Sequence, residues 1–403
     1  MKIKKLWILV LFITGFSCVS TSQEINSEAA FDFVETQTIF MLEEIEKVQK
    51  DPSEKGLFPR TISETGDLIL VPAKDWTSGF FPGVLWLLYE YTGDAKWLSE
   101  AENFTDVLEQ EKFNAVTHDI GFKIYCSYGN GYRLTQNEDY KEVIVQAAKT
   151  LITRYNPKVK AIRSWDHNTE KWEFPVIIDN MMNLELLFAA TRFSGDSTFY
   201  NVAVNHANTT LKNHFRKDNS SYHVIGYNPD TGEVETRGTH QGYSDESAWA
   251  RGQAWGLYGY TMSYRETKKE AYLEQAEKIA DFILNHPKLP KDMVPYWDFD
   301  APNLENEPRD VSAAIIIASS LYELSTFSNN VEKYREAADK ILKSLSEKYV
   351  SQNGQNRGFI LQNSTGNKPA NSEVNVPLNY ADYYFLEALS RQNQLKNGNK
   401  ISF

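Results

Sequence analysis

"LWLLYEYTGDAKWLSEAENFTDVL", residues 85–108, consists of two amphipathic segments joined by a short polar turn, Thr92-Gly93-Asp94. Apolar residues recur at i, i+3, i+4 and i+7 in both segments, which is the spacing of one face of an α-helix. An Ala lies near the start of the second segment, at Ala95. The stretch therefore predicts a hairpin of two helices.

The same pattern returns along the chain. It is clear in residues 184–211 and weaker in residues 131–152, 257–284 and 321–345. A sixth hairpin would pair a first long helix near Ala29 to Val48 with a last one near Ala381 to Leu389. Because the repeats are irregularly spaced, a solenoid of fixed period is disfavoured. We expect an all-α fold, an (α/α)6 barrel: a closed toroid of six helical hairpins whose long loops gather over one mouth.

Strand patterns are scarce. Residues 221–242, "SYHVIGYNPDTGEVETRGTHQG", alternate around a Pro-Asp-Thr-Gly turn and predict a short β-hairpin within a loop. No linker rich in Pro, Gly or Ser divides the chain. We expect residues 29–403 to form a single catalytic domain, preceded by a tether at residues 19–28.

The first residues have the features of an export signal. Three lysines among residues 2–5 precede the apolar run "LWILVLFITGF", which is too short to span a bilayer as a stable helix. Ser17-Cys18 resembles the end of a lipobox, although Gly15 stands where Leu is usual. We expect residues 1–18 to be a lipoprotein-type signal, and the protein to be exported to the periplasm or anchored to the outer membrane only by a lipid on Cys18. Cleavage before Ser20 or Ser22 is the alternative.

Composition excludes several functional classes. The formal net charge is −12 among 403 residues, so nucleic acid is not expected as a partner. If Cys18 is lipidated, Cys126 is alone and no internal disulfide can form. No CxxC or HExxH motif occurs and the seven His are scattered, so no metal site is predicted. Aromatic residues make up 13% of the chain, which suits sugar-binding walls and ordinary cores alike.

Residues that could take part in catalysis or binding gather in five loop-like stretches. Each lies at or just before an expected helix start: "DWTSGFFPG" (75–83), "THDIGF" (117–122), "FPVIIDNMMNL" (174–184), "THQGYSDESAWARGQAW" (239–255) and "VPLNYADYYFLEAL" (376–389). In a toroid, the starts of the inner helices point to one mouth. The positive ends of their dipoles lie there too, which favours an anionic ligand.

Asp119 and Asp179 come from different hairpins and are the candidate catalytic pair. Two carboxylates are the minimum for sugar chemistry, since one moves a proton while the other sets charge or position. If they lie near each other, their charges repel and their two pKa values separate, so that one carboxyl group stays protonated near neutral pH. The alternative for Asp179 is helix capping, because Asp is a favoured N-cap residue.

Other candidates are aromatic or basic. Arg251 and Trp255 in "ARGQAW" are i, i+4 neighbours on one helix face, where an Arg fork suits a carboxylate or sulfate and an indole suits a sugar ring. Packing of the Arg on the Trp is the alternative. His118 and His240 each follow a Thr and are proton-relay or structural residues. Trp76 is a platform or a core residue.

Taken together, the five stretches resemble glycoside hydrolase family 88, the unsaturated glucuronyl hydrolases. They occur in the family's order from Asp75 to Leu389. The resemblance implies an (α/α)6 barrel that needs no metal or organic cofactor. It also implies a substrate made by polysaccharide lyases: an anionic oligosaccharide ending in a 4,5-unsaturated glucuronic acid, which the enzyme removes by hydrating the C4=C5 bond.

The resemblance also implies roles for particular residues. Asp179 matches the general acid and base that protonates C4 and activates the water adding at C5, and Asp119 matches the second acid. Positions lining the uronate subsite match Thr239, Arg251 and Trp255. Neighbours in or near the pocket match His118, His223, His240, Gln241 and Trp76. The segment "NKPANSEVNVPL", residues 367–378, departs from the family pattern, so the contacts to the next sugar stay open.

Three alternatives stay open from the sequence. One is a hydrolase of unsaturated galacturonyl or rhamnogalacturonyl products on the same toroid, and another is an ordinary inverting glycosidase. The third, of another class, is a surface glycan-binding lipoprotein that would tolerate loss of both acids. The oligosaccharide is open as well, with glycosaminoglycan and sulfated algal ulvan fragments as the candidates.

Overall fold

The computed structural model describes residues 27–50 and 56–402. The expected signal and the start of the tether lie outside the described residues. The domain's first helix, α1, begins at Ser27, two residues before the predicted boundary. Among the described residues, no helix combines the length and apolar character needed to cross a bilayer.

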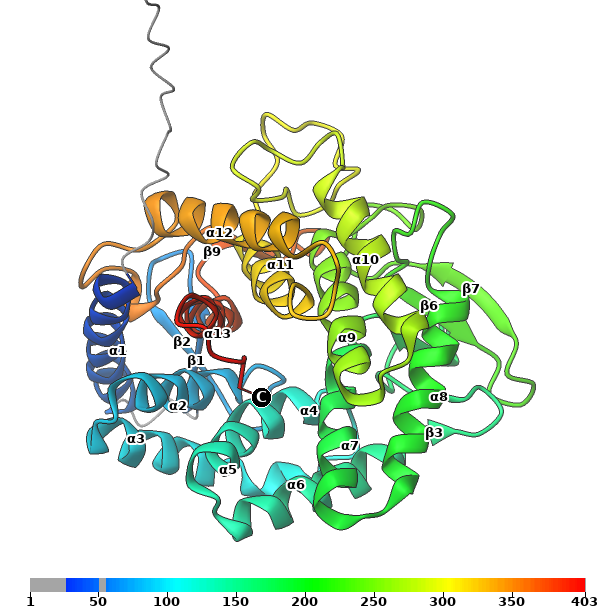
Figure 1. Cartoon of the computed structure of the whole chain (residues 1–403), viewed down its shortest axis with the longest axis horizontal. Coiled ribbons are helices and arrows are strands. Elements are labelled where there is room, and N and C mark those ends of the chain that lie inside the picture. The colour runs from blue at the N-terminus through cyan, green and yellow to red at the C-terminus, as the bar shows by residue number, and fades with distance from the viewer. Residues whose placement is uncertain (1–26, 51–55, 403) are drawn as a thin grey trace, which may run out of the picture.

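In the part of the chain that the structure describes, six helical segments form an inner ring and six helices surround it. Figure 1 shows this arrangement. The inner ring consists of α2 (Phe80–Thr92), α4 (Ile120–Ile124) continued by α5 (Asn130–Thr135), α7 (Asn180–Ser194), α9 (Ala250–Thr267), α11 (Val311–Leu324) and α13 (Asn379–Lys396). The outer helices are α1 (Ser27–Gln49), α3 (Ala95–Asp106), α6 (Glu138–Ile152), α8 (Ser197–Asn213), α10 (Glu270–Leu284) and α12 (Val331–Lys348). The (α/α)6 barrel predicted from the sequence is confirmed.

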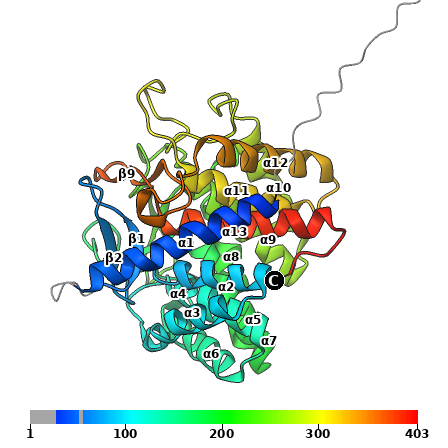
Figure 2. The ribbon, with the colours of Figure 1, turned by 90° about the vertical axis from the view of Figure 1, so that its left-hand side faces the viewer.

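The order of packing closes the ring. Each inner helix packs on its neighbours and on the outer helix that follows it in the chain, as α2 does on α3 and α9 on α10. The sixth pair is α13 with α1, so the two ends of the barrel domain meet as predicted. Figure 2 shows α1 lying along the outside of the barrel beside α13 and α2.

Sequence accounts for the two rings. All of α11 is buried; its sequence is mostly apolar, and its one charged residue, Glu323, is held by ion pairs. Outer helices such as α12 bury one face only, with Tyr334, Ala338, Ile341 and Leu345 at helical spacing. Inner helices therefore supply the core, and outer helices shield it from water.

The turns explain why some hairpins are easy to recognise. Gly93 and Gly195 end α2 and α7 in the left-handed conformation, at φ 68° and 74°. Asp94 and Asp196 then accept a backbone N–H at the start of the next helix. Gly tolerates this conformation and Asp is a good N-cap, so a Gly-Asp pair makes a sharp helix-to-helix turn. In two of the weaker copies a non-Gly residue takes the left-handed position: Gln136 at φ 57° and Lys268 at φ 56°.

Within residues 27–50 and 56–402, strands occur only as small sheets between helices. The predicted hairpin is present as β6 (Val224–Tyr227) and β7 (Val234–Gly238), and β5 (Phe174–Ile177) adds an unpredicted third strand beside β6. Three two-stranded sheets were also not predicted: β1 (Phe58–Ile62) with β2 (Leu68–Val71), β3 (Tyr155–Asn156) with β4 (Ala161–Ile162), and β8 (Ser364–Asn367) with β9 (Ser372–Val376). The short 3-10 segments are η1 (Glu109–Phe113) and η3 (Asn356–Gly358), and a π-turn, η2 (Tyr125–Gly129), joins α4 to α5.

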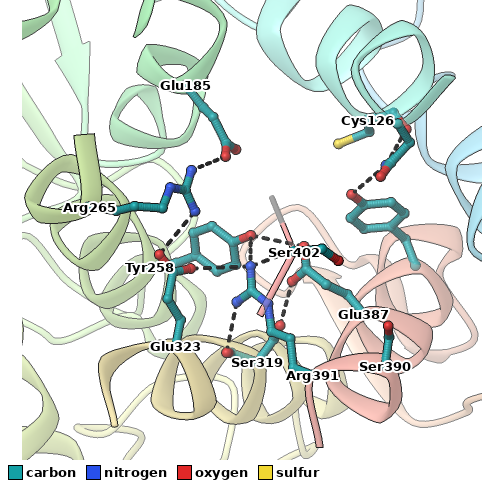
Figure 3. Close-up of polar contacts among 12 residues, drawn as sticks. Cys126, Glu185, Tyr258, Arg265, Ser319, Glu323, Glu387, Ser390, Arg391 and Ser402 are labelled. Atoms are coloured by element: carbon teal, nitrogen blue, oxygen red, sulfur yellow. Dashed lines mark hydrogen bonds and ion pairs between the residues drawn. The ribbon is translucent and has the colours of Figure 1, made fainter. Parts of the chain in front are cut away.

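Charged side chains of four inner helices form a network of ion pairs (Figure 3). Arg391 pairs with Glu323 at 3.2 Å and with Glu387 at 3.5 Å. Arg265 pairs with Glu323 at 3.0 Å and contacts Glu185. These contacts join α7, α9, α11 and α13 across the ring. A small cavity of about 70 Å³ lies beside them and shares Phe122 with the lining of the candidate site described below.

Candidate active site

A cavity of about 270 Å³ opens where the inner helices begin. Its walls come from the segments before α2, α4, α7 and α9, together with the turn after β7. The lining residues are Trp76, Val116, Thr117, His118, Asp119, Phe122, Ser164, Trp165, His167, Ile177, Asp179, His240, Gln241 and Arg251. The two candidate aspartates therefore share one cavity, as the sequence predicted. Helix N-termini surround it and favour an anionic ligand.

Asp179 lies between the end of β5 and the start of α7. Its side chain makes no capping hydrogen bond, so the capping alternative does not describe this carboxyl group. Oδ2 is buried and has no hydrogen-bond partner among the described residues; His223 Nε2 lies 3.6 Å away. Burial raises the pKa of Asp179 to about 7, with Asp119 adding to the rise while His118 and Arg251 oppose it. A substantial fraction of this carboxyl is thus protonated near neutral pH.

Asp119 precedes α4 and has the opposite electrostatic setting. The Thr117 hydroxyl donates to Oδ2 at 2.7 Å, and His118 Nε2 lies 3.1 Å from Oδ1. Burial alone would raise the pKa of Asp119, but His118, Thr117 and the charge of Lys123 outweigh it and lower that pKa. One carboxyl in the cavity is held ionised while the other tends to keep its proton, which is the division of labour needed for acid catalysis beside a stabilising charge.

Arg251 stands in the first turn of α9 and is almost completely buried. Nη1 donates to Asp310 Oδ2 at 2.9 Å and to the Thr365 carbonyl, and Nη2 donates to the Gly366 carbonyl at 2.6 Å. The guanidinium also lies 4.5 Å above the ring of Trp249. Arg251 therefore joins α9, the start of α11 and strand β8 at the edge of the cavity.

Seven of the ten predicted site residues line the cavity: Trp76, His118, Asp119, Asp179, His240, Gln241 and Arg251. Trp255 does not, and its assignment to the uronate subsite is wrong for this structure. Its side chain is fully buried between the rings of Phe122, at 5.2 Å, and Tyr384, at 5.6 Å. The residue i+4 from Arg251 lies about one helical turn deeper, about 6 Å farther along the helix axis.

Thr239 and His223 form a layer behind the lining. The Thr239 hydroxyl accepts a hydrogen bond from the Gly242 N–H at 2.7 Å and lies 3.4 Å from His223 Nδ1. His223 is 2% exposed. Neither residue is part of the cavity lining, and the assignment of Thr239 to the uronate subsite stays a prediction.

Several site residues escaped the sequence reasoning. Trp165 and His167 line the cavity with their rings stacked 5.2 Å apart, and Asp310 anchors Arg251. Asp298, in a segment given no role, accepts hydrogen bonds from the Tyr243 N–H and the Ser247 hydroxyl, and so braces the loop before α9. Only Asp310 had a readable signal, as a potential N-cap before an apolar run.

Known proteins are similar to this chain in sequence and in fold. Residues 60–397 match the profile of Glycosyl Hydrolase Family 88. An "Unsaturated glucuronyl hydrolase" of Formosa agariphila is 50% identical over 391 residues, covering 96% of this chain and 98% of the relative. An "Unsaturated chondroitin disaccharide hydrolase" of Streptococcus pyogenes is 32% identical, covering 83% and 85%. The crystal structure of an "unsaturated glucuronyl hydrolase specific for heparin" is 48% identical and superposes with a TM-score of 0.87, over 92% of this chain and 98% of the other.

Proposed function

Because the chain belongs to Glycosyl Hydrolase Family 88 and is an unsaturated glucuronyl hydrolase acting on anionic unsaturated oligosaccharides, we propose that Asp179 is its general acid and base and that Asp119 is the supporting charge. The observation that carries this proposal is the contrast between the two carboxyl groups of one cavity. The pKa of Asp179 is raised to about 7, and that of Asp119 is lowered.

The chemistry follows from an enol ether conjugated to a carboxylate. Protonation at C4 by Asp179 gives a cation at C5 that the ring oxygen shares, and the ionised Asp119 stabilises this charge. Asp179 is now a carboxylate and takes a proton from the water that adds at C5. The product is a hemiketal, which opens and releases the next sugar. The whole sequence is hydration followed by ring opening, and the two proton transfers of the hydration use Asp179 alone.

Arg251 supports uronate binding in this scheme. Three of the five N–H groups of an arginine side chain are held by Asp310, Thr365 and Gly366. The guanidinium remains at the cavity wall and places a positive charge there in a chain whose formal net charge is −12. We assign Arg251 to electrostatic attraction of the uronate carboxylate, and Trp76 and Trp165 to apolar contact with the sugar.

We further propose that the preferred substrates are lyase products of glycosaminoglycans, with heparin-type fragments ahead of chondroitin-type fragments. The support is the higher identity to the heparin-specific structure, 48%, than to the chondroitin disaccharide hydrolase, 32%. The enzyme would then act directly after a polysaccharide lyase, because only a lyase leaves the C4=C5 bond.

The test is a panel of lyase digests from heparin, chondroitin, hyaluronan and ulvan, with saturated oligosaccharides of the same composition as the matched control. Loss of the ultraviolet absorbance of the conjugated double bond reports hydration. We expect the highest kcat/KM on a heparin-type digest and no cleavage of the saturated control. A higher kcat/KM on chondroitin or ulvan fragments would overturn the substrate assignment, and cleavage of the saturated control would overturn the hydration mechanism.

We propose that the protein is exported and tethered by a lipid on Cys18. The support is the basic and apolar run that ends at Ser17-Cys18. In the native host, the Cys18→Ala variant should move from the membrane fraction to the soluble exported fraction. Full-length protein that fractionates identically with and without Cys18 would contradict the tether.

A further inference from the structure

His223 connects the turn after β7 with the catalytic carboxyl group. It directly precedes β6, and its carbonyl accepts the N–H of Ile178 at 3.1 Å, next to Asp179 in the chain. The ring lies 4.5 Å from that of Trp249, which fixes its plane. One ring nitrogen faces the turn and the other faces Asp179.

The nitrogen facing the turn is a hydrogen-bond acceptor. Two backbone N–H groups, of His240 and Gln241, point at Nδ1 from 3.2 Å each. A backbone N–H can only donate, so Nδ1 must offer its lone pair and cannot carry a proton. The proton of the neutral ring is therefore on Nε2. The surroundings disfavour a second proton: burial, His240, Arg251, His214 and His118 together hold the pKa of His223 well below its usual value.

The other ring nitrogen, Nε2, faces the carboxyl oxygen Oδ2 of Asp179. His223 Nε2 and Asp179 Oδ2 are both buried, and neither has a hydrogen-bond partner among the described residues. They lie 3.6 Å apart, slightly beyond the range of a good hydrogen bond. Catalytic hydrogen bonds are often long in a substrate-free site and shorten when charge develops. When Asp179 gives its proton away, a carboxylate appears opposite the Nε2–H, and a charge-assisted hydrogen bond can form.

We propose that the turn at His240 and Gln241 locks His223 in the Nε2–H tautomer, and that this N–H stabilises Asp179 in its ionised form during the reaction. His223 is thus a positioning residue that acts through Asp179. The inference deepens the role proposed above for Asp179 and rests on it. The loop before α9 would then help to fix the tautomer of His223. Asp245 and Asp298 hold the turn by accepting the N–H groups of Thr239 and Tyr243 at 2.9 Å each.

Two variants separate the two ends of the imidazole. The amide of Asn reaches the place of Nδ1 and can accept from the turn, but it offers Asp179 no donor. The amide of Gln reaches the place of Nε2 and restores that donor. The readout is the alkaline limb of the kcat/KM profile, which reports the pKa of Asp179 in the free enzyme. Thermal unfolding checks that both variants fold.

In the His223→Asn variant the alkaline limb should move to a higher pH than in the parent. The carboxylate without its donor is less stable, so the pKa of Asp179 rises. Its kcat should fall about tenfold, the size of one charge-assisted hydrogen bond. The His223→Gln variant should keep the limb near the parent's position and recover part of kcat. A parental profile and kcat in His223→Asn would overturn the link to Asp179, as would equal shifts in the two variants.

The tautomer itself is measurable without turnover. Two-bond ¹H–¹⁵N correlation of the full chain, with His223→Gln used for assignment, should show an unprotonated Nδ1 and a protonated Nε2. A proton on Nδ1, or on both nitrogens, would overturn the lock. Failure of the underlying role of Asp179 would appear separately, as undiminished turnover of the Asp179→Asn variant.

Discussion

Arg251 and Asp310 form an ion pair of 2.9 Å whose side chains are 2% and 0% exposed. Asp310 is also the N-cap of α11, where its Oδ1 accepts the Ala313 N–H. The pair thereby fixes the start of α11 to the start of α9 at the edge of the cavity. Two buried charges stabilise a fold only while both are present, since removing one leaves the other without compensation.

Replacing Asp310 by Ala should therefore destabilise the protein by about 3–5 kcal/mol. It should also raise KM, because Arg251 loses the contact that orients it. Urea unfolding and steady-state kinetics measure the two effects. The Glu274→Ala variant is the control: its partner Lys278 is exposed, at 3.9 Å, and its loss should cost less than about 1 kcal/mol. Equal costs for the two variants would contradict the structural role given to Asp310.

The pH dependence follows from the protonation state that each aspartate needs. Asp179 must be protonated to act as an acid, and its pKa is about 7, so kcat/KM should fall as pH rises through that value. The charge of Asp119 is one of the causes of this raised pKa. In Asp119→Asn the fall should move to lower pH, in addition to a loss of rate. A limb that stays in place in Asp119→Asn would show that the two carboxyl groups do not interact.

Stability should depend on pH through the same group. The pKa of Asp179 in the fold lies above its ordinary value of 3.8, so the folded state binds more protons than the unfolded state between pH 4 and 7. Stability is consequently lost as pH rises through this window. The Asp179→Asn variant should be more stable than the parent at pH 8 by a few kcal/mol (on the order of 1–4), and nearly equal to it at pH 4.

Urea unfolding at both pH values checks this prediction. The Asp230→Asn variant serves as the control, because Asp230 is 91% exposed and its substitution should change stability little at either pH. If the difference between Asp179→Asn and the parent is the same at pH 4 and pH 8, the raised pKa is contradicted.

Trp255 and Trp76 should respond differently to substitution. Trp255 is fully buried, so Trp255→Ala should cost about 3–5 kcal/mol of stability, whereas Trp255→Phe should fold and keep a near-parental KM. Trp76 lines the cavity, so Trp76→Ala should raise KM at a smaller cost in stability. Unfolding curves and kinetics distinguish the two. A large rise in KM for Trp255→Phe would show that Trp255 contributes to the uronate subsite.

The barrel fold could be predicted from the sequence because the patterns that indicate it are local. Helical periodicity marks each hairpin, and Gly93-Asp94 and Gly195-Asp196 mark two of the turns. Asp119 and Asp179 could be placed at one mouth because inner helices of a toroid start on the same side. The distance of a residue below that mouth is not local, which is why Trp255 was misplaced while Arg251, one turn earlier, was not.

The remaining site features depend on contacts between distant segments. Strand β8 reads as a polar loop, yet its carbonyls at Thr365 and Gly366 bind Arg251, more than a hundred positions away in the chain. The N-cap signal of Asp310 predicts a helix start but says nothing of a second partner. The tautomer of His223 depends on two backbone N–H groups that only the folded turn brings to the ring.

The most direct test of the account is the turnover of Asp179→Asn on an unsaturated disaccharide, followed by the loss of ultraviolet absorbance, with substrate binding measured in parallel by calorimetry. We expect binding close to that of the parent and a kcat lower by about 10²–10⁴-fold, the usual contribution of a general acid. A folded variant whose kcat stays within a few-fold of the parent would contradict the assignment of the proton transfer to Asp179.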